Sequence, residues 1–114
     1  MNVTELIEFF EGMGFAAAAG LDKPLQPDIE VRGLSNLYIR CYPAVSVNSK
    51  DSFQKIRAFC QERARKRKKK WVIFWKEKYG KIHALFEEGG CNDVDRKFLV
   101  KLNRWSRDDR LKGN

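Results

Sequence analysis

Hydrophobic residues recur at helical spacing in three parts of the chain. Near the N-terminus, four of them share one helix face and predict a helix over residues 2–13: Val3, Leu6, Ile7 and Phe10. A longer helix is predicted over residues 50–69, where Phe53, Ile56, Phe59, Cys60 and Ala64 form the apolar face. A third is predicted to start at Asn92 as its N-cap and to run to Ser106, with Val94, Phe98, Leu102 and Trp105 on its apolar side.

Strand-like patterns fill the segments between these helices. Alternation of apolar and polar residues predicts strands at 28–32, 37–42 and 82–86, the last ended by Gly89-Gly90. The run WVIFW at 71–75 is apolar on both faces and predicts a central strand that is covered on both sides. Residues 15–19 fit either a short strand or a helix. The order predicts an α/β fold in which helices flank a mixed sheet.

The strand at 37–42 carries unusual chemistry on one face. Because side chains alternate with period two, Leu37, Ile39 and Cys41 share one face, and Tyr38, Arg40 and Tyr42 share the other. Asp28 opens the strand before it. The sequence therefore predicts a charged and aromatic surface where these two strands meet, whereas His83 is interpreted as structural.

Composition limits the classes of protein that these elements can form. With 114 residues the chain predicts one domain over 1–106, followed by a flexible polar tail at 107–114. Three widely spaced cysteines and the absence of a C-x-x-C pair favour reduced thiols over a zinc site or a disulfide framework. Glutamates in the first predicted helix argue against a signal peptide, and no apolar run reaches membrane-spanning length. We therefore expect a cytoplasmic protein.

A strong positive charge points to the class of partner. The net charge is +8 and the pI is about 9.6, which favours a polyanion. Seven of the nine residues from 62 to 70 are basic: Arg63, Arg65, Lys66, Arg67, Lys68, Lys69 and Lys70. The helix macrodipole accounts for two or three cations at a helix C-terminus, but the others repel one another. We therefore predict that this run binds phosphates, and DNA is the expected ligand.

Taken in order, several pieces resemble the PD-(D/E)xK nuclease superfamily, specifically its small phage and archaeal Holliday-junction-resolvase-like branch. These pieces are Glu5 on the first helix, Pro27-Asp28 leading a strand, Ile39-Arg40-Cys41-Tyr42 on the next strand, Gln54 or Gln61 on the long helix, and the run at 71–75. The resemblance covers about residues 3 to 88. It implies a restriction-endonuclease-like sheet, a magnesium site formed by carboxylates, a branched-DNA substrate and a homodimer.

The resemblance fails at the two positions that carry the family's chemistry. Arg40 stands where the family has an acid, and a guanidinium repels a divalent cation and has no lone pair to offer it. Tyr42 stands where the family has a lysine, and a phenol is neutral near pH 7. We therefore expect a degenerate active site that holds nucleic acid without hydrolysis and needs no cofactor.

Two roles for Arg40 remain open from sequence alone. It can hold a backbone phosphate in a bidentate manner, with Tyr38 and Tyr42 beside it to stack on a base. It can equally pair with Asp28 as a structural ion pair. These two roles are compatible, since an arginine released from Asp28 can bind phosphate.

Two other functions also remain open. In the first, the protein is an active magnesium-dependent endodeoxyribonuclease whose acids have moved to Asp28, Glu30 and Glu5, with Asp28 as a metal ligand. Lys23 or Lys50 would then replace the missing lysine. In the second, a phage or mobile-element factor of this fold binds and inhibits a host protein.

Overall fold

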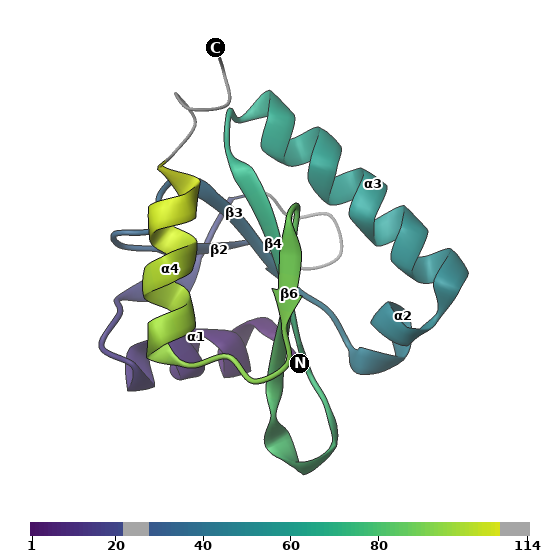
Figure 1. Ribbon diagram of the computed structural model, residues 1–114, viewed down its shortest axis with the longest axis horizontal. Helices are drawn as coiled ribbons and strands as arrows, with labels where there is room; N and C mark the ends of the chain where they lie inside the picture. Colours follow the sequence, from purple (N-terminus) through teal and green to yellow (C-terminus); the bar gives the residue numbers. More distant parts are fainter. Residues whose placement is uncertain (22–27, 108–114) are drawn as a thin grey trace.

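Helices cover both faces of one β-sheet in the computed structural model, which describes residues 1–21 and 28–107 (Figure 1). Within these residues there are four α-helices, one 3₁₀ turn and six strands. In chain order they are α1 (Val3–Gly12), β1 (Ala17–Ala19), β2 (Ile29–Val31), β3 (Leu37–Cys41), α2 (Ala44–Asn48), α3 (Lys50–Lys66), β4 (Lys70–Lys76), η1 (Lys78–Gly80), β5 (Ile82–Phe86), β6 (Gly89–Cys91) and α4 (Arg96–Ser106).

The strands lie in the sheet in the order in which they occur in the chain. Neighbouring strands are antiparallel except β3 and β4, which run parallel with Arg40 opposite Ile73. A parallel pair needs a long crossover, and the segment containing α2 and α3 supplies it. The sheet is therefore mixed, with its parallel join in the middle.

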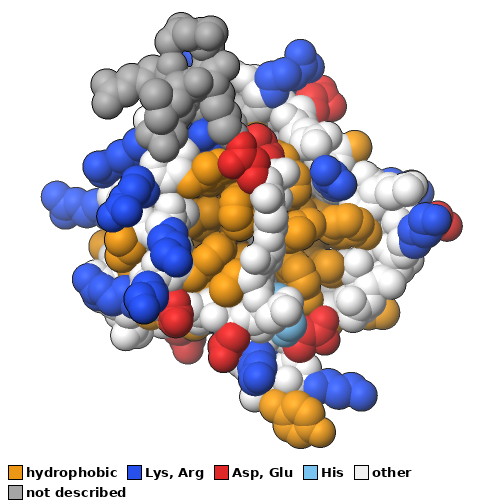
Figure 2. Space-filling model, in the orientation of Figure 1, with side chains coloured by type: hydrophobic (Ala, Val, Ile, Leu, Met, Phe, Trp, Pro, Cys, Tyr) orange, Lys and Arg blue, Asp and Glu red, His pale blue; other side chains and the backbone are white. Residues whose placement is uncertain are grey.

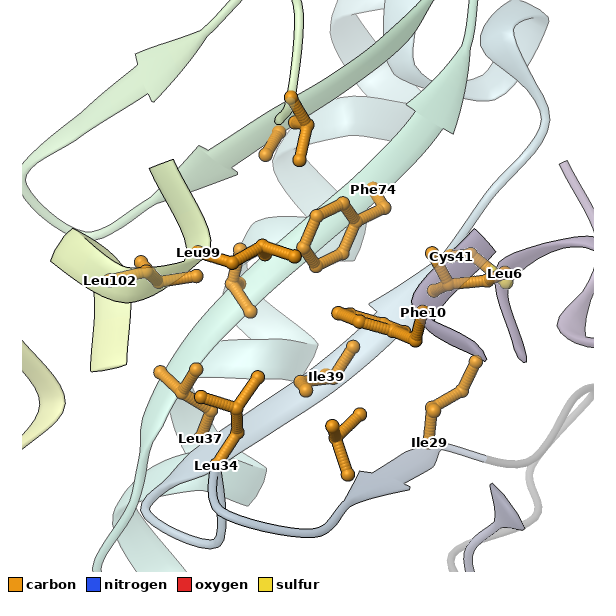
Figure 3. Packing of buried hydrophobic residues seen from close by; sticks show 14 of the residues in the cluster. Leu6, Phe10, Ile29, Leu34, Leu37, Ile39, Cys41, Phe74, Leu99 and Leu102 are labelled. Carbon is orange, nitrogen blue, oxygen red and sulfur yellow. The ribbon is translucent and has the colours of Figure 1, made fainter. Parts of the chain in front are cut away.

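Each face of the sheet has its own hydrophobic cluster. On one face α1 and α4 pack against the sheet, and Figure 3 shows Phe10 and Leu99 pointing toward Ile39 and Phe74. The rings of Phe10 and Phe74 meet edge to face at 5.6 Å. On the other face α3 packs its buried side against the sheet, in a smaller cluster made of Tyr38, Cys60, Ala64, Trp71 and Ile73. Both sides of β4 are thus buried.

Most of the predicted elements are confirmed. The predicted strands at 28–32, 37–42, 71–75 and 82–86 correspond to β2, β3, β4 and β5, and residues 17–19 form a strand rather than a helix. The alternation predicted for residues 37–42 is also confirmed, because Leu37, Ile39 and Cys41 lie in the α1–α4 cluster and Tyr38 lies in the α3 cluster. The predicted α/β class with a mixed sheet between helices is correct.

Two local predictions differ from the structure, and one short element was not predicted. Gly89-Gly90 begins β6 instead of ending the sheet, because both glycines pair with β5. The last helix begins at Arg96 rather than near Asn92, since Asp95 is its N-cap and its Oδ1 accepts a hydrogen bond from the Phe98 N–H at 2.8 Å. The short helix α2 was not predicted, because five residues are too few to establish a helical period.

Candidate nucleic-acid interface

The side chain of Arg40 lies at the centre of a buried polar cluster beneath α3. Its Nη1 donates to Tyr38 Oη and its Nε donates to Tyr42 Oη, each at 3.1 Å. The guanidinium also lies over the ring of Phe59 on α3, 5.2 Å from the centroid. Only 3% of Arg40 is exposed. Three neighbouring aromatic side chains therefore hold the guanidinium in place and cover it.

The electrostatics of this cluster keep Arg40 charged and Tyr42 neutral. Burial by itself disfavours the charged form of Arg40, but the hydrogen bonds and charge interactions with Tyr38 and Tyr42 outweigh it, so the pKa of Arg40 is raised. Burial raises the pKa of Tyr42, with a further contribution from Cys60, whose Sγ lies 3.8 Å from the phenolic oxygen. At neutral pH the hydrogen bond between these two side chains therefore joins a charged guanidinium to a neutral phenol.

Asp28 immediately precedes β2, the strand that pairs with the strand of Arg40. The antiparallel register that pairs Ile29 with Ile39 places Asp28 next to Arg40 at the following step of the ladder, on the same face. Asp28 is 2% exposed, and its carboxylate packs so closely on Gly20 that a methyl group there would collide with it. Arg67 Nη1 lies 3.9 Å from Asp28 Oδ2. The carboxylate is therefore enclosed and has cations around it.

The C-terminal end of α3 brings two more arginines onto this cluster. Arg63 lies over the ring of Phe59 at 5.1 Å, and Arg67 lies over the ring of Tyr38 at 5.8 Å. These two arginines are one helical turn apart and stack on rings that also contact Arg40. The aromatic residues thus fix the positions of three guanidiniums in succession, from the buried Arg40 to the partly exposed Arg63 and Arg67.

A Schellman motif ends α3 and directs the remaining cations outward. The Lys69 N–H donates to the Ala64 carbonyl at 2.8 Å, and the Lys68 N–H donates to the Arg65 carbonyl at 3.1 Å. Lys68 takes the left-handed conformation of this motif, with φ of 56°. Arg65, Lys66 and Lys68 are exposed, and Lys66 pairs with Glu62 at 3.2 Å.

Lys70 was predicted to bind phosphate with its neighbours but lies inside the protein. It is 6% exposed, and its Nζ donates to the Trp105 carbonyl at 2.8 Å, near the end of α4. The ammonium also lies 4.5 Å from the Trp105 ring centroid. A cation that satisfies a carbonyl at a helix C-terminus stabilises that helix, so Lys70 joins β4 to α4.

The other predicted acids do not gather around Asp28. Glu5 lies on α1, which covers the opposite face, where its Oε1 accepts from the Asn2 N–H at 3.0 Å and its Oε2 lies 3.5 Å from Lys76 Nζ. The hydrogen bond at Asn2, more than the nearby Lys76, lowers the pKa of Glu5. Glu30 is exposed opposite Ala18. Lys50 opens α3, at the far end of that helix from Arg67, and Lys23 lies outside the described residues.

Magnesium, which the family resemblance implies, does not fit the residues around Asp28. A hard dication needs several oxygen ligands, but the Arg67 guanidinium lies 3.9 Å from this carboxylate and Arg40 is on the adjacent strand, and both side chains repel a cation. In the described part of the chain, no three His, Cys, Asp or Glu side chains are grouped as metal ligands.

A second row of cations was not singled out from sequence. Lys97, Lys101 and Arg104 occur at i, i+4 and i+7 on the exposed side of α4, which contains no acidic residue between Arg96 and Ser106. Figure 2 shows Lys and Arg side chains gathered on the α4 side of the molecule. The signal in the sequence was the helical spacing of these cations, which the denser run at 62–70 obscured.

The arrangement as a whole is a buried arginine–tyrosine cluster with an exposed cationic helix end above it. Such a surface can bind anions, and its stacked arginines are already ordered. Among residues 1–21 and 28–107, no helix has the length and hydropathy to span a bilayer. No family model matches this chain, and the comparisons with curated proteins and with solved structures also found no match.

Proposed function

We propose that the protein binds the phosphate backbone of nucleic acid, DNA in the first instance, without cutting it. The binding surface is the α3 basic end, which we define as Arg63, Arg65, Lys66, Arg67, Lys68 and Lys69. One observation carries the proposal: Arg63 and Arg67 are stacked on Phe59 and Tyr38, so their guanidiniums lose little freedom on binding. An arginine fork that is already positioned suits bidentate phosphate recognition.

The backbone at the end of α3 supports the same interpretation. Lys68 occupies the left-handed position of a Schellman motif, where glycine is the preferred residue. A lysine in this conformation costs roughly 1–2 kcal/mol relative to an unstrained residue. Lys68 therefore destabilises the fold slightly. This favours the interpretation that its charge serves to bind a ligand.

We propose that the protein does not cleave nucleic acid because of the residues beside Asp28. If the fold is a restriction-endonuclease-like one, β2 and β3 are the strands that would hold the metal, and Arg40 takes the place of the second acid. A buried guanidinium repels a divalent cation at that position. The antiparallel β2–β3 pair followed by a crossover to a parallel β4 supports such a topology.

The proposal assigns Arg40 a positioning role rather than direct contact with phosphate. The guanidinium is too buried to meet a ligand, and Phe59 and the two tyrosines cover it. Arg40 instead holds Tyr38, and Tyr38 in turn supports Arg67.

Binding measurements on two matched double variants test the proposal. Arg65→Gln with Lys68→Gln removes two charges from the α3 basic end, and Lys97→Gln with Lys101→Gln removes two from α4. The first is expected to weaken binding to duplex DNA about tenfold or more, and to reduce the slope of log K against log salt by about 0.9 for each phosphate that is no longer neutralised. Fluorescence anisotropy across a salt series measures both quantities.

The α4 variant is the control for net charge. If it weakens binding as much as the α3 variant, binding is spread over the whole charge of the protein and the assignment to α3 is wrong. Cleavage is scored in the same samples with and without magnesium, on duplex and four-way junction DNA. Nicking by the wild type that disappears in Asp28→Ala would replace this proposal with the nuclease interpretation.

A further inference from the structure

The hairpin between β4 and β5 extends away from the body of the molecule (Figure 1) and has an aromatic residue at its tip. Tyr79 is 99% exposed, which makes it by far the most exposed of the large hydrophobic residues in the hairpin. Figure 2 shows a hydrophobic side chain at the far end of this hairpin with Lys or Arg side chains beside it. At this exposure the ring buries almost no apolar surface, so its hydrophobic contribution to the stability of the fold is small.

The base of the hairpin is braced, so the position of the tip is fixed. Trp75 and His83 stack across the strands with their ring centroids 5.5 Å apart. Trp75 Nε1 donates to Glu77 Oε1 at 2.9 Å, and the Glu77 N–H donates to the Lys81 carbonyl at 2.9 Å. Asn48 on α2 also donates to Glu77 Oε1, at 3.5 Å. The ring of Tyr79 is therefore presented from an ordered support.

The turn itself does not favour tyrosine. Tyr79 and Gly80 have φ of 67° and 77°, two left-handed residues in succession. The Gly80 N–H donates to the Glu77 carbonyl at 3.2 Å, so Tyr79 occupies the third position of this turn. Positive φ at that position favours Gly or Asn and disfavours a bulky side chain. Tyr79 thus weakens the turn that it occupies, so the stability of the fold does not account for a tyrosine at this position.

The charges around Tyr79 indicate the ligand. Lys76, Lys78 and Lys81 are exposed within six residues, while the one acid of the tip, Glu77, is engaged by Trp75 and Asn48. Aromatic rings with cations beside them are how proteins hold single strands: the ring stacks on a base and the cations bind the adjoining phosphates.

We propose that Tyr79 stacks on an unpaired base of bound nucleic acid, while Lys78 and Lys81 contact its backbone. This inference rests on the proposed function and narrows its ligand to nucleic acid with single-stranded or open bases. The tip and the α3 basic end lie at opposite ends of β4, whose seven residues extend about 20 Å. A ligand that meets both must therefore follow the direction of this strand.

Two substitutions separate the ring from the turn. Tyr79→Asn removes the ring and places a residue favoured at positive φ in the turn, so its unfolding temperature should equal or exceed that of the wild type. Tyr79→Phe keeps the ring. We expect Tyr79→Asn to weaken binding of a single-stranded oligonucleotide about five- to a hundredfold, the range of one base–aromatic stack, and to change duplex affinity less than about twofold. Tyr79→Phe should bind as the wild type does.

A 2-aminopurine base in the single strand provides a direct readout, because stacking quenches its fluorescence. Quenching by the wild type and by Tyr79→Phe, but not by Tyr79→Asn, is the expected result. Unchanged single-strand affinity and quenching in Tyr79→Asn would overturn this inference and leave the proposed function standing. Equal losses for single strand and duplex would also overturn it. If the wild type binds neither ligand at low salt, the proposed function fails first.

Discussion

A buried arginine can serve a binding surface without reaching its ligand. Arg40 donates to two phenolic oxygens and lies over Phe59, and one of those phenols supports Arg67 at the surface. The alternation of residues 37–42 predicted which face Arg40 would share with Tyr38 and Tyr42. Its burial was not predictable, because Phe59 and Cys60 approach from a helix about twenty residues further along the chain.

Arg40→Met tests this supporting role. Methionine fills similar space, but it leaves both phenolic oxygens without their donor, so we expect a loss of about 2 kcal/mol or more in the free energy of unfolding. Urea denaturation measures the loss, with Tyr42→Phe as the control that removes only one of the two hydrogen bonds. DNA affinity measured well below the unfolding transition should fall only modestly. A large loss of affinity with unchanged stability would show that Arg40 contacts phosphate itself.

At the scale of elements, long periodic segments were predictable and short or glycine-rich ones were not. The helical period of Phe53, Ile56 and Cys60 predicted α3, and the apolar run at 71–75 predicted β4 as a strand buried on both sides. β6 has the sequence GGC, which carries no alternation, and only its pairing with β5 makes it a strand. Lys70 likewise belongs to the basic run in sequence, yet its bond to Trp105 depends on tertiary packing.

Lys68→Gly tests the end of α3. Glycine takes the left-handed conformation freely, so after its larger unfolded-state entropy is subtracted the variant should gain roughly 0.5–1 kcal/mol in the free energy of unfolding. Lys68→Ala is the control, because it removes the same charge but keeps the strained Cβ, so it should gain only the small relief of charge repulsion that both variants share. Thermal or urea unfolding measures stability, and anisotropy should show weaker DNA binding in both variants. A glycine variant no more stable than the alanine variant would contradict the strain argument.

For the whole molecule, the net charge of +8 makes stability and binding respond oppositely to salt. Cations crowd the α3 basic end and the exposed side of α4, and their mutual repulsion opposes the compact state. Screening by salt weakens that repulsion, but it also weakens attraction to phosphates. Opposite responses of stability and affinity to salt are expected of a cationic surface whose charge repulsion is relieved by binding a polyanion.

We therefore expect the unfolding temperature to rise as sodium chloride is added up to roughly physiological ionic strength, while DNA affinity falls over the same range. Differential scanning fluorimetry and anisotropy in matched buffers measure the two trends. The Arg65→Gln, Lys68→Gln double variant should show a smaller rise, since it starts with less repulsion. An unfolding temperature that drops with salt would mean that ion pairs such as Lys76–Glu5 outweigh the repulsion.

The parallel join between β3 and β4 has a consequence for how the molecule assembles. Antiparallel neighbours such as β4 and β5 are joined by short turns, so each pair closes a small loop at little entropic expense. The β1–β3 and β4–β6 halves of the sheet are joined by the pairing of β3 with β4. This pairing must close the long loop that contains α2 and α3. Arg40 lies on one strand of this pair, and Arg63 and Arg67 lie at the end of the crossover helix. We therefore expect the proposed phosphate-binding surface to form together with this long-range pairing, so that a partly folded chain lacks it.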